Sequence, residues 1–238
     1  PNERGFDHFH GFLGDMMDSY TTHLRHGNNY MRLNEKTIDP PGHATDLFTD
    51  WTSAYLRDRA KHRDQPFFLY LAHYAPHLPL HARPEDIAKY RGKFKKGWDK
   101  LREEKYQRMI DMGIIDPSNK LSAKTKFTKD WDKLEPKRQE AMELRMAIYA
   151  AMIEDMDTAI GRFLKALDEA GLRENTLVIF KSDNGGYNGD NLPLRGLKGM
   201  LYEGGIRVPW IVRWPGKVQP GTTNSTPVIS TDCYPTLL

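Results

Sequence analysis

The stretch Thr-Leu-Val-Ile-Phe-Lys-Ser-Asp-Asn-Gly-Gly at residues 176–186 decides the fold class. Its first five residues, 176–180, form a predominantly apolar run, which is typical of a strand buried on both faces. A second run of this kind, Phe-Phe-Leu-Tyr-Leu-Ala, occupies residues 67–72 between Pro66 and a proline-rich segment. Because a strand buried on both faces needs a layer on each side, the pattern predicts an α/β fold with a largely parallel sheet between helices.

The longest helical pattern lies just before residue 176. Its apolar positions are separated by alternating steps of four and three residues: Met142, Met146, Tyr149, Ile153, Met156, Ile160, Phe163 and Leu167. This spacing predicts one amphipathic helix of about 33 residues, with Gly171 at its C-terminal cap and the stripe packed in the core. Shorter helices are predicted at 45–62 and at 99–112, while Pro76, Pro79 and Pro84 predict an irregular loop.

Composition excludes several classes of protein. The 238 residues suffice for one sizeable domain or for part of a larger one, and the single cysteine excludes an internal disulfide or a cysteine-rich zinc site. No apolar run reaches the roughly 18 residues of a membrane span. The net charge is +3, but residues 89–138 hold 16 Lys and Arg against 8 Asp and Glu. We interpret 89–136 as a solvated basic excursion and not as a nucleic-acid surface, because aromatic residues are sparse there.

Polar residues follow directly after the strand predicted at 176–180. In α/β folds, ligands bind beyond the carboxyl ends of the strands, and here that place holds Asp183 and Asn184. Their carboxylate and amide oxygens suit a hard cation such as Ca²⁺ or Mg²⁺. Two oxygens do not complete a shell of about six to eight ligands. By itself, this motif fits an ordinary Asp-Asn-Gly-Gly turn better.

Two further side chains are candidates for contact with an anion. His73, His77 and His81 recur every fourth residue, but Pro76 and Pro79 exclude the helix that would make them a metal triad. His77, held between those two prolines, is instead positioned to point into a cleft, although a plain surface or core histidine fits equally well. Lys198, flanked by Gly196 and Gly199, either meets a small tetraoxyanion as a point charge or lies in a surface turn.

Taken in order, these segments resemble the sulfatase family, in the arylsulfatase branch of the alkaline-phosphatase-like superfamily. The resemblance rests on segments in the family's order over nearly the whole chain: Gly-Phe-Asp-His-Phe-His-Gly-Phe at 5–12, Ala-Pro-His-Leu-Pro at 75–79, Ser-Asp-Asn-Gly-Gly at 182–186, Pro-Leu-Arg-Gly-Leu-Lys-Gly at 193–199, Tyr-Glu-Gly-Gly-Ile-Arg-Val-Pro at 202–209 and Tyr-Pro-Thr-Leu-Leu at 234–238. It implies an alkaline-phosphatase-like α/β domain with a central, mostly parallel mixed sheet between helices. Residues 1–238 would form part of that single catalytic domain, with the basic excursion at 89–136.

The resemblance also implies a role for each candidate residue. Asp183 and Asn184 would ligate one Ca²⁺ (or Mg²⁺) ion that holds the sulfate group. His77 and Lys198 would be both catalytic and substrate-binding: His77 would protonate the departing alcohol, and Lys198 would contact the sulfate and bridging oxygens. The activity implied is sulfuric ester hydrolysis on a sulfated small molecule or sulfated glycan, in a secreted, periplasmic or lysosomal protein. No nucleic acid partner is implied.

The family's nucleophile motif, a cysteine oxidised to formylglycine followed by Ser and Arg, has no counterpart in these residues, and neither has its paired Asp-Asp. We therefore expect an upstream segment to supply the nucleophile and the 238 residues alone to be inactive. Two alternatives stay open: a phosphatase or phosphodiesterase of the same superfamily, and a non-catalytic relative that binds anionic glycans. All of this requires His77, Asp183, Asn184 and Lys198 to converge in space.

Overall fold

The computed structural model describes residues 1–124, 128–187, 191 and 194–237. Pro193 and Leu238 of the motifs above, and residues 125–127 of the basic excursion, lie outside the described residues. The helices are α1 (Ala44–Arg59), α2 (Pro84–Tyr90), α3 (Gly97–Asp111), α4 (Pro136–Glu169), α5 (Glu203–Ile206) and α6 (Cys233–Leu237). The strands are β1 (His10–Phe12), β2 (Leu24–Arg25), β3 (Asn28–Asn29), β4 (Met31–Leu33), β5 (Lys36–Thr37), β6 (Val178–Lys181) and β7 (Trp210–Arg213). Short 3-10 turns occupy Asn2–Arg4, Trp131–Lys133, Arg173–Asn175 and Ser230–Asp232.

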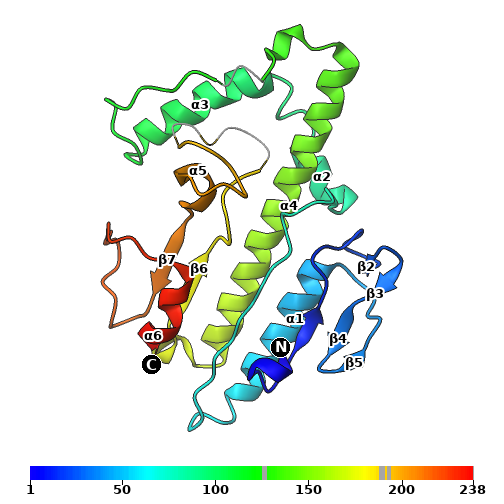
Figure 1. The fold of residues 1–238 in the computed structure, drawn as a ribbon, viewed down its shortest axis with the longest axis vertical. Coiled ribbons are helices and arrows are strands. Elements are labelled where there is room, and N and C mark those ends of the chain that lie inside the picture. The colour runs from blue at the N-terminus through cyan, green and yellow to red at the C-terminus, as the bar shows by residue number, and fades with distance from the viewer. Residues whose placement is uncertain (125–127, 188–190, 192–193, 238) are drawn as a thin grey trace.

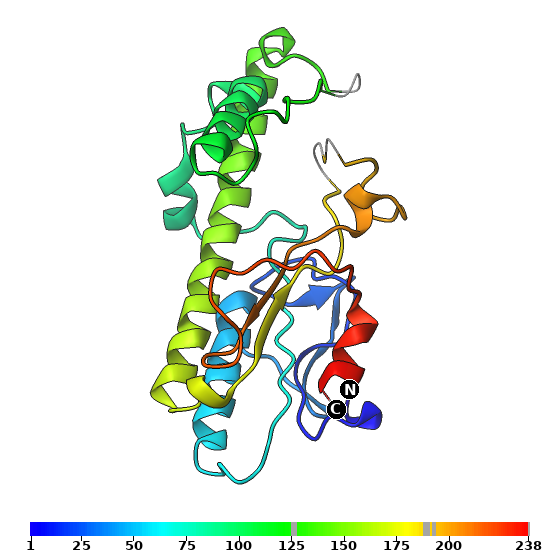
Figure 2. The ribbon, with the colours of Figure 1, turned by 90° about the vertical axis from the view of Figure 1, so that its left-hand side faces the viewer.

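Helix α4 forms the spine of the molecule (Figures 1 and 2). The sequence predicted a helix of about 33 residues and the structure has 34, with Gly171 in the left-handed conformation just after it. Helices α1 and α2 both pack on α4. The α4 face toward the core carries small side chains, among them Ala147, Ala151 and Ala159, which are all buried. Small side chains let neighbouring helices approach closely, and the covered face of α4 carries several of them.

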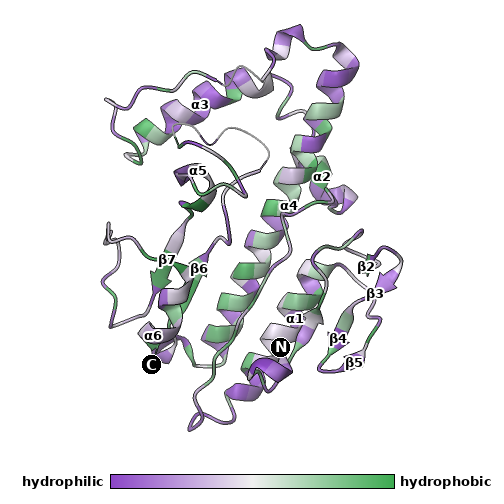
Figure 3. Cartoon of the chain, in the orientation of Figure 1, coloured by the Kyte–Doolittle hydropathy of each residue, from purple (hydrophilic) through white to green (hydrophobic). Residues whose placement is uncertain are grey.

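The prediction that the whole apolar stripe of α4 lies in the core is wrong for its first half. Met146, Tyr149 and Ile153 are exposed, whereas Leu167 is fully buried and Phe163 packs beside it. Green bands along α4 in Figure 3 mark its apolar positions. The spacing identified the helix correctly, but the buried face of α4 also carries alanines, and α1 and α2 both pack on this helix.

The sheets differ from the prediction of a largely parallel arrangement. Every strand pair in the described part of the chain is antiparallel: β1–β4–β5, β2–β3 and β6–β7. A strand at 176–180 is confirmed as β6 to within two residues, and Val178 pairs with Arg213 of β7. The predicted burial on both faces is wrong for this strand, because none of its four residues is buried and Phe180 is exposed. Within the described residues, the second run at 67–72 is extended but belongs to no sheet. A strand is defined by its ladder partner, which the local sequence of 67–72 cannot reveal.

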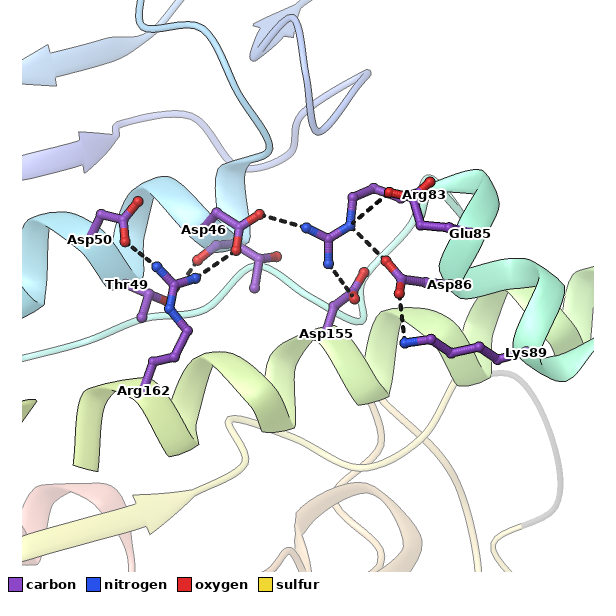
Figure 4. Close-up of polar contacts among 10 residues, drawn as sticks. Asp46, Thr49, Asp50, Arg83, Glu85, Asp86, Lys89, Asp155 and Arg162 are labelled. Atoms are coloured by element: carbon purple, nitrogen blue, oxygen red, sulfur yellow. Dashed lines mark hydrogen bonds and ion pairs between the residues drawn. The ribbon is translucent and has the colours of Figure 1, made fainter. Parts of the chain in front are cut away.

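The proline-rich loop between residues 73 and 83 runs into α2, which begins at Pro84. The expected irregular structure therefore ends at Pro84, since proline fits the first turn of a helix, where its missing N–H is not needed. At this junction, Arg83 forms ion pairs with Asp46 of α1, Asp86 of α2 and Asp155 of α4 (Figure 4). One guanidinium thus ties the end of the loop to three helices.

The excursion at 89–136 folds as a lobe at one end of α4 (Figure 2). The predicted helix at 99–112 is α3, which ends at Asp111. Asp99 accepts a hydrogen bond from the Trp131 N–H and pairs with Lys124, while Trp98 packs edge-on against Trp131. Arg91 pairs with the buried Glu143 carboxylate of α4. The lobe is therefore held by its own polar contacts and attached to the spine. None of the helices in the described residues is long and apolar enough to cross a membrane.

Candidate active site

His77 is held through all four of its polar groups. Its main-chain N–H donates to the Tyr74 carbonyl (3.0 Å), and its carbonyl accepts from the Tyr20 hydroxyl (3.0 Å). On the ring, Nδ1 lies 3.0 Å from the Leu78 carbonyl oxygen, and Nε2 lies 3.4 Å from Nζ of Lys198. A carbonyl oxygen only accepts hydrogen bonds, so Nδ1 carries a proton in this arrangement. The Nε2 lone pair then faces the Lys198 ammonium.

Lys198 reaches His77 from a separate loop, 121 residues further along the chain. The loop follows β6, and its position is set by backbone contacts: the Lys198 N–H donates to the Gly186 carbonyl at 3.1 Å. The Lys198 side chain is half-buried. One cationic amine and one imidazole, both held by their main chains, therefore meet at a single point beside the carboxyl end of β6.

Asp183 and Asn184 lie in the turn directly after β6, as predicted. The Asn184 amide donates to Asp183 Oδ2 at 2.5 Å, and the Ser182 hydroxyl donates to the Asn184 carbonyl at 3.0 Å. This turn is joined to the Lys198 loop because the carbonyl of Gly186 accepts the Lys198 N–H. The structure thus brings His77 and Lys198 into contact and places Asp183 and Asn184 on the adjoining turn.

The glycines of these motifs allow two loops to touch through their backbones. A Cβ on Gly185 would lie 2.0 Å from the Gly204 carbonyl oxygen, and a Cβ on Gly204 would lie 2.1 Å from that of Gly196. The Gly185 N–H donates to the Gly205 carbonyl at 2.8 Å. These glycines are therefore explained by packing of the 182–186 turn on the 196–205 segment, and not by a ligand.

Sequence reasoning missed Asn191, which joins the same loops. Its side-chain amide lies 3.0 Å from the Gly186 carbonyl oxygen, 3.2 Å from that of Gly196 and 3.1 Å from that of Gly204. Three carbonyls from three turns thus converge on one NH₂ group. An isolated asparagine in a loop gives no signal of such a contact, because its acceptors are distant in sequence.

Tyr20 and Tyr74 were also missed, although both donate to the backbone of the His77 loop. The Tyr74 hydroxyl donates to the same Leu78 carbonyl that faces His77 Nδ1. His73 and His81 take other roles: His81 Nδ1 accepts from the Tyr20 N–H, and burial lowers the pKa of His73.

The oxygen atoms that this turn offers are of the kind that a hard cation prefers, but they are too few to complete its coordination shell. Asp183 offers carboxylate oxygens and Asn184 an amide oxygen, and Ca²⁺ and Mg²⁺ prefer ligands of this kind. In the part of the chain that the structure describes, no three or more His, Cys, Asp or Glu side chains are grouped closely enough to hold a metal ion. A cation at this turn would need additional oxygen ligands.

Comparison with known proteins identifies the family. The family description "Sulfatase" matches residues 1–238. The chain belongs to the sulfatase family. A sulfatase of Formosa agariphila is 35% identical over 225 residues, which cover 90% of this chain and 32% of the relative. An arylsulfatase of Klebsiella aerogenes is 30% identical over 192 residues, covering 78% of this chain and 41% of the relative.

A solved structure supports the same fold for this sulfatase chain. The structure of Ps i-CgsB in complex with k-i-k-neocarrahexaose matches 99% of the chain with a TM-score of 0.68 and 29% sequence identity. The match covers 46% of that protein. This sulfatase chain thus spans between 32% and 46% of the length of these three relatives. The mixed α/β arrangement with small antiparallel sheets is accordingly part of a sulfatase domain.

Proposed function

We propose that residues 1–238 form part of a single catalytic domain that hydrolyses sulfuric esters, with the lobe at 89–136 as an excursion from it. Hydrolysis of sulfate esters is the activity of the family to which the chain belongs. The observation that carries the assignment to these residues is the 3.4 Å contact between Lys198 Nζ and His77 Nε2. Two groups that distant in sequence meet only because the fold brings them together.

The pair is suited to the departure of an alcohol from a sulfate ester. As the S–O bond breaks, negative charge grows on the bridging oxygen, and a positioned cation such as the Lys198 ammonium stabilises it. To act as the acid, the His77 ring must first take up a second proton from solvent at Nε2, which replaces its contact with Lys198 there. It would then donate that proton to the departing alcohol and return to the neutral ring with Nδ1 protonated. Because Nδ1 already faces the Leu78 carbonyl, the ring keeps its Nε2 edge toward the reacting group in either protonation state.

Asp183 and Asn184 would provide two of the oxygen ligands of a Ca²⁺ or Mg²⁺ ion. When bound, that ion would supply positive charge to the non-bridging sulfate oxygens. The remaining ligands, and the formylglycine nucleophile, would come from outside these 238 residues. We therefore propose that the chain by itself does not turn over sulfate esters.

The substrate class that we propose is a sulfated small molecule or a sulfated glycan. The solved structure of Ps i-CgsB contains an oligosaccharide, k-i-k-neocarrahexaose, and this chain is 29% identical to it. The lobe at 89–136 carries exposed lysines, including Lys95, Lys100 and Lys105, that would favour an anionic chain over a neutral one.

Hydrolysis of a chromogenic aryl sulfate by the full-length protein tests the proposal. Lys198→Ala and His77→Ala should each lower kcat by about 10²–10³-fold, the cost of one lost electrostatic donor at a reacting centre. Lys137→Ala, an exposed lysine at the start of α4, is the matched control and should keep full activity. Wild-type rates in both site variants would refute the assignment. A preference for the corresponding aryl phosphate would favour a phosphatase.

A further inference from the structure

Tyr20 is a fully buried residue far from the site in sequence, and it contacts the His77 loop. Its ring stacks on His43 at 5.0 Å and lies 5.0 Å from the ring of Tyr74. Its main-chain N–H donates to His81 Nδ1, and its carbonyl accepts from the Ala44 N–H at the start of α1. The ring is thus in contact with two other rings and its backbone is hydrogen-bonded at both polar groups, so the position of its hydroxyl is set by the core.

The Tyr20 hydroxyl acts as a donor in this environment. Burial raises the pKa of the phenol, which therefore keeps its proton across the working range of pH. The hydroxyl lies 3.0 Å from the His77 carbonyl oxygen, 57 residues along the chain. A carbonyl can only accept, so the phenol donates its proton to the peptide group that joins His77 to Leu78.

This hydrogen bond controls the orientation of the His77 ring through one peptide group. The peptide between His77 and Leu78 is fixed by Tyr20, and the next carbonyl, that of Leu78, faces His77 Nδ1 at 3.0 Å. The Leu78 carbonyl also accepts from the Tyr74 hydroxyl, so Tyr20 and Tyr74 hold two successive carbonyls of this loop. Rotation of the first peptide would change the angle at which the Leu78 carbonyl meets Nδ1. This change would weaken the contact that keeps the Nε2 edge of the ring toward Lys198.

We propose that Tyr20 is a positioning residue for His77, and that its hydroxyl holds the imidazole with Nδ1 protonated and Nε2 facing the reacting group. The inference rests on the proposed function of His77. In this role Tyr20 needs no contact of its own with substrate or Lys198. It acts through the backbone of His77, from a segment that sequence motifs leave unassigned.

Tyr20→Phe in the full-length protein removes the hydroxyl and keeps the stacked ring. We expect kcat on an aryl sulfate to fall about tenfold, the effect of one hydrogen bond, with KM within about twofold. Tyr106→Phe is the matched control, since Tyr106 also donates its hydroxyl to a backbone carbonyl, that of Asn119 in the lobe. It should leave kcat unchanged. Replacing Tyr20 by 4-aminophenylalanine, which retains an N–H donor, should restore most of the rate.

A spectroscopic readout separates positioning from loss of stability. In ¹⁵N NMR, the His77 ring of the wild type should show a protonated Nδ1, and Tyr20→Phe should shift the ring toward a mixture of tautomers. An unchanged kcat together with unchanged His77 ring shifts would overturn the inference. Should Tyr20→Phe fail to fold, NMR of the wild type still tests the inference. The Tyr20 hydroxyl proton should exchange slowly with water and lie close to the His77–Leu78 backbone. Its absence from that place would overturn the inference.

Failure of the proposed function gives a different result. If His77→Ala retains wild-type hydrolysis, His77 is not the acid and the proposed function fails. The ring shifts of Tyr20→Phe then still report whether Tyr20 orients His77. Loss of activity in His77→Ala with a fully active Tyr20→Phe protein would instead refute only the positioning role.

Discussion

Replacing Arg83 by methionine should destabilise the protein by removing the charge that holds the His77 loop to three helices. The guanidinium lies 2.6 Å from Asp86 Oδ2, 3.0 Å from Asp155 Oδ1 and 3.0 Å from Asp46 Oδ2 (Figure 4). The side chains of Asp86 and Asp155 are only 7% and 8% exposed. Methionine keeps much of the volume of arginine, but these carboxylates then lose the positive charge of the Arg83 guanidinium.

The magnitude follows from the burial of each partner. Breaking a fully buried ion pair costs about 3–5 kcal/mol, whereas an exposed pair contributes about 0–1 kcal/mol. Arg83 is 43% exposed, and Asp86 keeps a second partner in Lys89 at 2.8 Å. Asp155, by contrast, has one oxygen, Oδ2, that is buried without a hydrogen bond. We therefore expect a loss of about 2 kcal/mol in the free energy of unfolding at pH 7, mostly at Asp155.

The loss should depend on pH with a defined sign. Burial raises the pKa of Asp155, and the neighbouring Arg83 opposes that increase. Without Arg83 the pKa of the folded state rises further above the unfolded value of about 3.9. A carboxyl with a raised pKa in the folded state binds its proton more tightly there than in the unfolded state. Its ionised form therefore lowers the free energy of unfolding fully above the folded-state pKa, and this loss disappears as the pH falls toward the unfolded-state pKa. The defect of Arg83→Met should thus be smaller at about pH 4.5 than at pH 7.

Urea unfolding of the wild type, Arg83→Met, Asp155→Asn and the double variant measures the effect. In the Asp155→Asn background, Arg83→Met should lower the free energy of unfolding by less than about half of its effect in the wild type, because no buried charge is left unpaired at position 155. Arg162→Met is the matched control, since its partners Asp46 and Asp50 are well exposed. A loss for Arg83→Met no larger than that of the control, or one independent of Asp155, would refute the reasoning.

Three further predictions concern the turns around the site, and a fourth substitution, in helix α4, is a control for the glycine variant. Asn191→Asp keeps the shape of the side chain but turns an oxygen toward three carbonyls. We therefore expect kcat/KM on an aryl sulfate to fall by at least about tenfold. A rate equal to the wild type's would show that the Asn191 contacts do not hold these loops for the reaction. Gly185→Ala places a Cβ 2.0 Å from the Gly204 carbonyl oxygen and should cost about 1–3 kcal/mol by thermal unfolding. Gly161→Ala in α4 meets open space and should instead stabilise by up to about 1 kcal/mol. Asp183→Asn should raise the Ca²⁺ concentration that restores activity after chelation, and an unchanged requirement would argue against Asp183 as a ligand.

Local patterns predicted the secondary structure well where a segment is long or strongly periodic. The helix at 45–62 is α1, the helix at 99–112 is α3, and the apolar stripe from Met142 to Leu167 is α4. Helical periodicity is a property of the chain within one element, so it can be read without knowledge of neighbours. The strand at 176–180 was predicted from its apolar run, which is likewise a property of one segment of the chain.

The same patterns failed wherever the outcome depends on a partner. Residues 67–72 have the composition of a buried strand, but a strand also requires a ladder partner. Tyr149 and Ile153 belong to the apolar stripe of α4, yet they are exposed in this part of the domain, while α1 and α2 pack on the same helix. The direction of pairing between β6 and β7 likewise depends on how the chain returns to the sheet.

The sequence by itself determined the chemistry available to this sulfatase chain: a histidine between two prolines, a lysine between glycines, and an Asp-Asn pair after a strand. Tertiary structure alone decided that His77 and Lys198 meet at 3.4 Å, and that Tyr20 and Asn191 hold the loops which carry them. The physical reason is that hydrogen bonds act over about 3 Å of space, whatever the separation along the chain. Residue types can be read from the sequence, whereas their distances arise only when the core brings the segments together.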